Sequence, residues 1–309
     1  DSAPSRLAAL LSGDVDFIDN VPTTDIARLK KEPSVALSQG VSNRVIYLHL
    51  DQFRDVAPYT TAKDGSEIKN PFKDVRVRRA ISKAINRDLI IDRVMEGVAI
   101  KAGQLLPDGF FGSSDKLKPE EYDPEGAKKL LVEAGYPDGF KTVLFGPNDR
   151  YINDAKIVEA ISQMLSRIGI DTTPETMPKS VFFKRGKNGG PDKPVEYCFM
   201  LVGWGSGTGE PSSPLKSLLA TYNKAKGYGS SNRGLYSNPK MVEVLEKALA
   251  TVDDDKRAAL LAEATEISVG QDLGIIPLHY QVNTWAAKKG LKYIPRTDER
   301  TLAMGVVKG

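Results

Sequence analysis

Four glycines alternate with other residues in GWGSGTGE, residues 203–210, and this segment is a strong candidate for ligand contacts. The apolar run from Val195 to Val202 precedes it and is typical of a buried strand, and a helix is expected from about Ser212. A glycine-rich turn at the carboxyl end of a strand is where α/β proteins place ligand sites, because glycines let a ligand approach backbone amides. Trp204 adds a large flat face. The alternative interpretation is a tight turn with a core tryptophan.

A second segment, FGPNDRYINDA at residues 145–155, has the same layout. A strand that ends at Phe145 leads through a Gly-Pro turn into a helix. The polar side chains expected at the mouth of this turn are Asn148, Asp149, Arg150 and Tyr151. Arg150 has the geometry to hold a carboxylate through two hydrogen bonds, and Asp149 is a suitable helix cap. The alternative is a capping turn with a solvated arginine.

Two other polar patterns have simpler structural explanations. His49 alternates with apolar residues in VIYLHL, which favours a packed strand side chain over a catalytic base. Asp14, Asp16 and Asp19 lack the glycine and the distal glutamate of a calcium loop, so a solvated turn is favoured over a cation site.

Arg79, Lys83 and Arg87 are spaced four residues apart on an expected helix. Such a stripe suits phosphate groups, but the acidic residues Asp74, Asp88 and Asp92 are interleaved with it. The pattern therefore favours a surface with ion pairs.

Composition excludes several classes of protein. The 43 Lys and Arg residues minus 40 Asp and Glu residues give a net charge of +3, which does not indicate a nucleic-acid partner. The single cysteine, Cys198, excludes an internal disulfide, and with only two histidines it excludes the usual structural zinc sites. No apolar run approaches the roughly 18 residues of a membrane span, and the templates of serine hydrolases, zinc proteases and P-loop enzymes are absent.

Helix and strand patterns alternate along the 309 residues, which predicts a mixed α/β fold. The clearest helices are 152–168 and 241–252, whose apolar residues form one continuous face. Further helices are expected at 6–11, 23–31, 74–85, 88–96, 123–134 and 256–268. Strands are expected at 15–18, 35–37, 45–50, 141–145, 195–202 and 275–280, with short strands after Trp285. Segments 51–71, 103–122 and 184–194 have loop composition.

Six stretches, taken together, resemble the C-terminal part of the family 5 extracellular solute-binding proteins, the peptide, nickel and opine receptors of bacterial ABC importers. They are RLAALLSGDVDFIDNVP (6–22), FKDVRVRRAISKAINRDLIIDRVMEGVA (72–99), YDPEGAKKLLVEAGYPDGF (122–140), VGWGSGTGEPSS (202–213), YSNPKMVEVLEKALATVD (236–253) and IIPLHYQVNTWA (275–286). They occur in family order and span nearly the whole chain, and their combination is specific.

This resemblance implies lobes of the type II periplasmic-binding-protein kind, hinged around a cleft. The family's usual chain is longer, with a signal peptide, the first part of lobe I and a small domain before the point where this sequence starts. We therefore expect a partial chain. Residues 1–48 would belong to lobe I, 49–284 to lobe III, and 285–309 to the returning tail of lobe I.

The resemblance also implies ligand contacts. The family's Gly-Trp turn lines the cleft and matches Gly203-Trp204. In peptide-binding members an aspartate three residues after this tryptophan grips the ligand's amino terminus; Gly207 stands here, which removes that ion pair. Some dipeptide-binding members hold a carboxylate with an arginine near the position of Arg150, at an offset of two residues. The expected contacts are Asn148, Arg150, Tyr151, Trp204, Gly205, Gly207, Thr208 and Glu210.

The function expected from the resemblance is a non-enzymatic periplasmic receptor with no cofactor and no metal. It would deliver a peptide-like, opine-like or other small polar organic solute to the permease subunits of an ABC importer. One alternative is a peptide chaperone or interaction module. Another is a hydrolase that uses Glu210 or Asp149 with His279, although no acid and base stand at a recognisable spacing.

Overall fold

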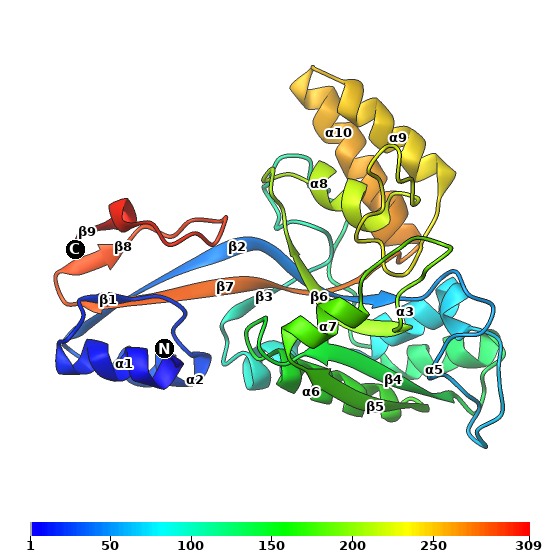
Figure 1. Cartoon of the computed structure of the whole chain (residues 1–309), viewed down its shortest axis with the longest axis horizontal. Helices are drawn as coiled ribbons and strands as arrows, with labels where there is room; N and C mark the ends of the chain where they lie inside the picture. The colour runs from blue at the N-terminus through cyan, green and yellow to red at the C-terminus, as the bar shows by residue number, and fades with distance from the viewer. Residues whose placement is uncertain (1) are drawn as a thin grey trace.

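The computed structural model describes residues 2–309 and shows a body with a long arm (Figure 1). One sheet of seven strands runs through both parts in the order β1-β7-β2-β6-β4-β5, with β3 beside β7. Its strands are β1 (Phe17–Ile18), β2 (Val35–Leu50), β3 (Ala99–Lys101), β4 (Phe140–Pro147), β5 (Ile170–Met177), β6 (Phe199–Gly205) and β7 (Ile276–Lys288). Strand β4 is parallel to β5 and β6, whereas β2 is antiparallel to β6 and β7.

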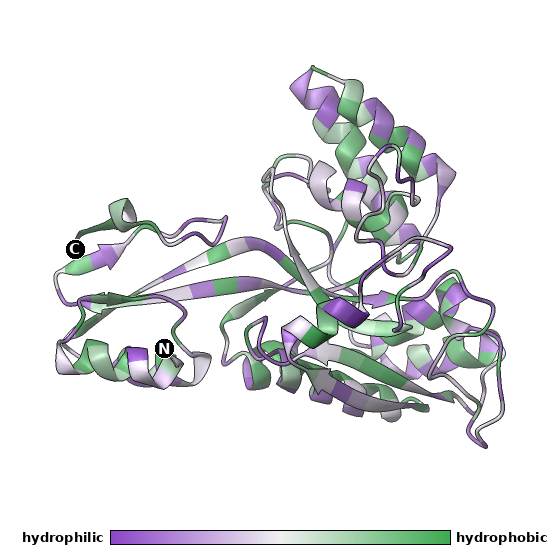
Figure 2. Cartoon of the chain, in the orientation of Figure 1, coloured by the Kyte–Doolittle hydropathy of each residue, from purple (hydrophilic) through white to green (hydrophobic). Residues whose placement is uncertain are grey.

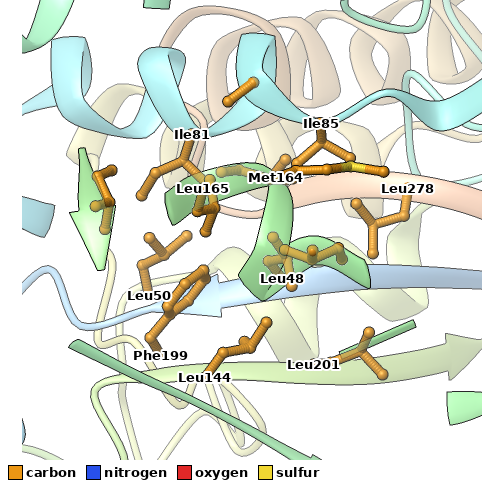
Figure 3. Close-up of a cluster of buried hydrophobic side chains, with 14 of the residues drawn as sticks. Leu48, Leu50, Ile81, Ile85, Leu144, Met164, Leu165, Phe199, Leu201 and Leu278 are labelled. Atoms are coloured by element: carbon orange, nitrogen blue, oxygen red, sulfur yellow. The ribbon is translucent and has the colours of Figure 1, made fainter. Parts of the chain in front are cut away.

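In the body, helices cover both faces of the sheet, which explains the apolar runs. Ile46 and Leu48 of β2 join one buried cluster, and the alternating Val45 and Tyr47 join the other. The first cluster packs under α3 (Val75–Ala84), α5 (Pro124–Glu133) and α6 (Asp154–Ser166), and Figure 3 shows leucine and isoleucine side chains of this cluster together with Phe199.

The second cluster packs against helices on the opposite face of the sheet. They are α7 (Lys179–Arg185), α8 (Ser212–Pro214) with a π-helical turn at Leu215–Leu219, α9 (Pro239–Ala250), and α10 (Asp254–Thr265) with a π-helical turn at Glu266–Gln271. The short α4 (Arg87–Leu89) also continues as a π-helical turn at Ile90–Val94, and 3₁₀ turns occupy Pro71–Lys73 and Ala303–Gly305. Asp123 and Pro124 begin α5 as expected, with the Asp123 carboxylate accepting from the Gly126 amide at 2.8 Å.

The arm consists of the outer halves of β2 and β7 with smaller elements around them. Helices α1 (Ala3–Ser12) and α2 (Thr23–Leu29) pack on it through a small apolar cluster that includes Leu7, Leu10 and Leu29. Strands β8 (Leu291–Tyr293) and β9 (Val306–Lys308) form a separate antiparallel pair near the C-terminus. Apolar and polar residues alternate around α1 and α9 (Figure 2), as expected for helices that bury one face.

The structure differs from the expected elements in several places, and strand β3 is one that was not expected. The two strands expected at 35–37 and 45–50 are one strand, β2, with a shift of register between Val41 and Val45. Strand β5 and helix α7 were not expected; β5 reads IDTTPETM and carries a proline, which suits the sheet edge that it occupies. Within residues 2–309, no helix has the length and apolar content to cross a membrane.

Candidate ligand pocket

Strand β6 carries Trp204 to the end of its pairing with β2. Trp204 lies opposite Val45, and Gly205 lies opposite Arg44. The strand extends to Gly205, past the Val202 end of the strand expected from the sequence, so Trp204 belongs to the strand and not to the turn after it. Its indole is half-buried against the second apolar cluster.

Gly203 lets Tyr151 approach this strand closely. A Cβ at position 203 would lie 2.6 Å from Ile46 Cδ1 and 2.9 Å from a ring carbon of Tyr151, distances that real Cβ atoms do not show. The Tyr151 hydroxyl donates to the Gly203 carbonyl at 3.1 Å. The glycine therefore fixes the tyrosine ring beside Trp204.

The turn between β4 and α6 positions Arg150 and Tyr151 through one buried carboxylate. The backbone amides of both residues donate to Asp154 Oδ2 at 2.9 Å, and the Ala155 amide donates to Oδ1 at 3.0 Å. Burial raises the pKa of Asp154 above its ordinary value, although these three hydrogen bonds oppose the shift. Asp154 thus holds the backbone in a conformation in which the side chains of Arg150 and Tyr151 reach the pocket.

Asp149 does not cap the helix that follows it, which corrects the cap suggested by the sequence. Its Oδ1 accepts from the amide of Lys179, the first residue of α7, at 2.6 Å. The residue before α6 is Asn153, whose backbone is left-handed and whose side chain makes no cap bond. Asp149 therefore links the turn after β4 to the start of α7 and does not cap α6.

These elements enclose a cavity of about 260 Å³, which we call the Trp204 pocket. It is lined by Arg44, Arg150, Tyr151, Phe183, Val202, Gly203, Trp204, Gly205 and Arg233. Four of the expected contacts, Arg150, Tyr151, Trp204 and Gly205, thus come together. The other four expected contacts, Asn148, Gly207, Thr208 and Glu210, do not line it.

The arginine side chains surround the tyrosine ring. The Arg150 guanidinium lies 5.0 Å and that of Arg44 lies 5.9 Å from the centre of the Tyr151 ring. Burial raises the pKa of Tyr151, against the opposing charges of Arg150, Arg44 and Arg233, so its hydroxyl stays a donor near neutral pH. The pocket therefore combines aromatic faces with positive charge.

The glycine-rich segment after β6 turns inward instead of facing this pocket. Glu210 is buried, and its carboxylate accepts from the amide and hydroxyl of Ser212 and pairs with Arg257 at 3.3 Å. Burial raises the pKa of Glu210, but the Ser212 bonds and the Arg257 charge outweigh it and hold the pKa below its ordinary value. Ser206 Oγ donates to the Glu210 carbonyl at 2.8 Å, which closes the turn on itself.

Sequence reasoning missed Arg44, Phe183, Val202 and Arg233 as lining residues. Arg44 immediately precedes the apolar run VIYLHL, and in the structure it lies inside β2, next to the shift of register between Val41 and Val45. Arg233 follows the Ser-Ser-Asn stretch of a turn, and no local pattern marks it. Both reach the pocket through pairings between distant parts of the chain.

A smaller cavity of about 180 Å³ shares Arg150 with the Trp204 pocket. The residues that line it with Arg150 are Asn20, Ile152, Gln281, Asn283, Trp285, Glu299 and Thr301. Several of these belong to the arm or its tail, so Arg150 lies between the pocket of the body and a polar cavity toward the arm.

Both histidines are buried strand residues. His49 Nε2 accepts from the Gly234 amide at 3.2 Å, and burial, helped by the Arg233 charge, lowers its pKa to about 3. Neither ring nitrogen of His279 has a hydrogen-bond partner among residues 2–309, and burial lowers its pKa to about 4. His279 is therefore not bonded to Glu210 or Asp149, the acids considered for hydrolysis.

The structure places the Asp14, Asp16 and Asp19 carboxylates on different partners. Asp14 accepts from Ser12, Asp16 pairs with Lys288, and Asp19 accepts weakly from Thr301. Among the described residues, no three His, Cys, Asp or Glu side chains are grouped so that they could hold a metal ion.

Two of the three residues of the basic stripe of α3 and α4 form ion pairs, as the sequence favoured, but with other acids. Arg79 and Lys83 pair with Glu120 at 3.0 and 3.7 Å, and Lys83 also pairs with Asp123. Arg87 is buried and donates to backbone carbonyls, including that of Pro277. The interleaved aspartates Asp74 and Asp88 pair instead with Arg76 and Lys101.

Comparison with known proteins agrees with this architecture. The chain is 30% identical over 286 residues to heme-binding protein A of Haemophilus influenzae, covering 91% of the chain and 47% of that protein. It is 28% identical over 283 residues to the dipeptide-binding protein of Escherichia coli, covering 91% of the chain and 48% of that protein. The structure of the periplasmic binding protein DppA of Helicobacter pylori with the peptide STSA superposes with a TM-score of 0.78 at 27% identity, over 94% of the chain and 52% of DppA.

The chain thus spans about half the length of these relatives. The similar structures confirm the fold expected from the sequence. The model of the bacterial extracellular solute-binding proteins, family 5 Middle, matches residues 1–226, and the chain belongs to this family.

Proposed function

We propose that this chain is part of a periplasmic receptor that binds a peptide-like or other small polar organic solute and delivers it to an ABC importer without catalysis. The observation that carries the proposal is the Trp204 pocket. A half-buried indole, the Tyr151 ring and guanidinium groups converge there from segments that lie between residues 44 and 233 of the sequence. Aromatic faces with a few placed polar groups are what small-molecule sites use.

We assign residues 49–284 to lobe III and residues 1–48 and 285–309 to lobe I, with the cleft between them. Strands β2 and β7 run without a break through both boundaries and join the body to the arm. Bending of these two strands would move the arm relative to the Trp204 pocket, a hinge closure of the kind used by binding proteins. Asn148, Gly207 and Thr208, which are exposed, would then lie toward the outer rim of the site.

The test is the effect of Trp204→Ala on ligand affinity in the protein with its full natural sequence. The solute is first identified by mass spectrometry of small molecules released from the purified protein, and is then titrated by calorimetry. Truncation of a central aromatic contact costs about 2 kcal/mol, or about 30-fold in Kd. Tyr122→Ala is the control, because Tyr122 is an exposed aromatic that lines none of the cavities described above. If the Trp204 and Tyr122 variants bound the ligand equally tightly, the ligand would not bind in the Trp204 pocket.

A further inference from the structure

Strands β2 and β7 lose their regular pairing where they pass from the body into the arm. Val45 packs in the second cluster of the body, and Val282 packs against the small cluster of the arm. Val41 pairs with Val282 and Val45 with Tyr280, which leaves three residues of β2 opposite one residue of β7. We call these three residues, 42–44, the β2 bulge. A bulge interrupts the ladder of backbone hydrogen bonds, so bending here disturbs fewer of them than bending elsewhere along the strands.

Two residues of the β2 bulge contact the body. The side-chain amide of Asn43 donates to the carbonyl of Ser206, in the turn after β6, at 2.7 Å. Arg44 lines the Trp204 pocket, and a Cβ built on Gly205 would lie 3.2 Å from Arg44 Nη2. Glycine at position 205 thus leaves room for the Arg44 guanidinium beside β6.

The β2 bulge is also bound to the tail, through the carboxylate of Glu299. This residue lies in the loop between β8 and β9, which extends from the arm back along β2 (Figure 1). Its carboxylate accepts from Nε and Nη2 of Arg44 at 2.6 to 3.0 Å and from the Ser42 hydroxyl at 2.8 Å. It also accepts from the side-chain amide of Gln281 at 3.0 Å. One carboxylate therefore binds both strands at the bulge, and we call this set of bonds the Glu299 clamp.

The backbone of Glu299 is strained. Its φ of 63° lies in the left-handed region, which a residue with a Cβ adopts only where its surroundings enforce it. Burial would raise the pKa of Glu299, but the bonds and charge of Arg44, with help from Ser42 and Arg150, outweigh it and hold the pKa below its ordinary value. The carboxylate is therefore ionised near neutral pH, and its bonds to Arg44 are charge-assisted.

A second polar contact joins the body to the arm away from the bulge. The side-chain amide of Asn153, before α6, donates to the hydroxyl of Thr23, the first residue of α2, at 2.9 Å. This is one bond between uncharged groups, and charge-assisted bonds are roughly twice as strong as such a bond. The Glu299 clamp is therefore the stronger of the two connections.

We infer that the β2 bulge is the pivot between the body and the arm, and that the Glu299 clamp sets the orientation of the arm relative to the Trp204 pocket. This inference rests on the proposed function and names the residue that controls its hinge. Glu299 is a positioning residue that acts through Arg44. Since Arg44 belongs both to the clamp and to the wall of the Trp204 pocket, a solute that draws Arg44 away from Glu299 releases the arm for closure.

The test measures the distance between arm and body by double electron–electron resonance, in the protein with its full natural sequence and without added solute. Spin labels are attached to p-acetylphenylalanine placed at the exposed positions Ala8 of α1 and Lys129 of α5. A second pair, at Lys129 and the exposed Ala250 of α9, lies within the body. We expect Glu299→Gln to broaden the arm–body distance distribution at least about twofold and to leave the distribution within the body unchanged.

Three further variants show whether Glu299 acts through Arg44. Arg44→Gln removes the other half of the ion pair and should broaden the distribution equally, and the double variant should broaden it no further. Arg44→Lys keeps the charge but cannot form two parallel bonds, so it should give an intermediate width. Asp298→Asn is the control, because Asp298 lies in the same loop but pairs with Arg296 at 2.6 Å, and it should leave the width unchanged.

Three results would contradict the inference. If Glu299→Gln broadened the distribution no more than Asp298→Asn does, Glu299 would not clamp the pivot. Broadening of both label pairs would mean that the whole protein loosens, and would overturn the pivot at the bulge. A double variant broader than either single variant would overturn the link through Arg44. Each of these results leaves the receptor function standing, because that function is tested separately by the solute affinity of Trp204→Ala.

Discussion

Two turns of the body follow parallel strands and lead into helices, yet they have opposite roles. The turn after β4 spans residues 148–153 and presents Arg150 and Tyr151 to the Trp204 pocket. The turn after β6 spans residues 206–211 and closes on itself around Glu210. In sequence, both read as polar turns at the end of a buried strand.

The position of the organising carboxylate accounts for the difference. Asp154 lies after its turn and collects the amides of Arg150 and Tyr151, so those side chains are free to point away from it. Glu210 lies within its own turn, and its carboxylate binds Ser212 and Arg257 in the direction of α10. When the carboxylate that binds a turn's amides lies after the turn, the side chains of the turn remain free to line the pocket. When the carboxylate belongs to the turn itself, that side chain is taken up by contacts within the protein.

The largest expected effect comes from removing the carboxylate of Asp154, the residue that follows the turn after β4. Asp154→Ala removes the acceptor of three backbone amides, those of Arg150, Tyr151 and Ala155, and an unsatisfied buried donor costs about 1–3 kcal/mol. We expect the free energy of unfolding to fall by about 3 kcal/mol in urea titrations. Ligand affinity should fall as well, because Arg150 and Tyr151 lose their fixed backbone.

Glu210→Gln is the matched change in the second turn. It removes the charge that pairs with Arg257 but keeps the size of the side chain, so stability should fall by about 1–2 kcal/mol. Because Glu210 binds Ser212 and Arg257, we expect its replacement to leave ligand affinity unchanged. If Glu210 were a ligand contact, as the sequence predicted, affinity would fall. If Glu210→Gln weakened binding as much as Asp154→Ala, the contrast between the turns would be wrong.

The sequence was sufficient for the elements whose patterns are local. The Asp123-Pro124 helix start appears as predicted. The apolar face of the helix predicted at 241–252 is present up to Ala248, but α9 ends at Ala250 and Val252 is exposed. The buried run before Trp204 is also present, although its strand begins at Phe199 and not at Val195. Strand β5 was missed because an edge strand with polar residues lacks an apolar pattern. Four of the residues singled out in the sequence, Trp204, Gly205, Arg150 and Tyr151, come together in the structure because they lie at or just after the carboxyl ends of the neighbouring strands β6 and β4.

The rest of the site depends on long-range pairing. Arg44 reaches the pocket because β2 pairs with β6 across more than 150 residues of sequence. Glu210 and Asp149 look like ligand or capping groups in sequence, and only the packed structure shows their partners, Arg257 and Lys179. The direction in which a turn's side chains point is therefore not encoded in the turn alone.

A smaller effect on ligand affinity is expected from introducing an aspartate at Gly207 in the turn after β6. Gly207→Asp meets open space, so the free energy of unfolding should change by less than about 0.5 kcal/mol. An exposed ion pair contributes about 0.2–1 kcal/mol, so the affinity for alanyl-alanine amide should rise up to about fivefold. Calorimetry of the variant beside Gly207→Asn isolates the charge. No difference between them would mean that position 207 does not face the ligand, against what the family resemblance implies.

The smallest expected effect is a difference in pH dependence between the two turns. The folded-state pKa of Asp154 is raised above its ordinary value of 3.8. At pH values between 3.8 and the folded-state pKa, the folded state therefore binds more protons than the unfolded state. Its contribution to stability is therefore largest at low pH and declines as the pH rises through the folded pKa. The pKa of Glu210 is instead lowered from 4.5, so its contribution is present above that value and is lost as the pH falls through the folded pKa.

Urea titrations of Asp154→Asn and Glu210→Gln between about pH 3 and pH 6 should therefore diverge from the unmodified protein with opposite signs. The cost of Glu210→Gln should grow as the pH rises, because the variant cannot gain the ionised pair with Arg257. The cost of Asp154→Asn should shrink over the same range, because the unmodified protein must ionise a buried carboxyl that the variant lacks. If both costs grew with pH, burial would not dominate at Asp154, and the two carboxylates would stabilise their turns in the same way.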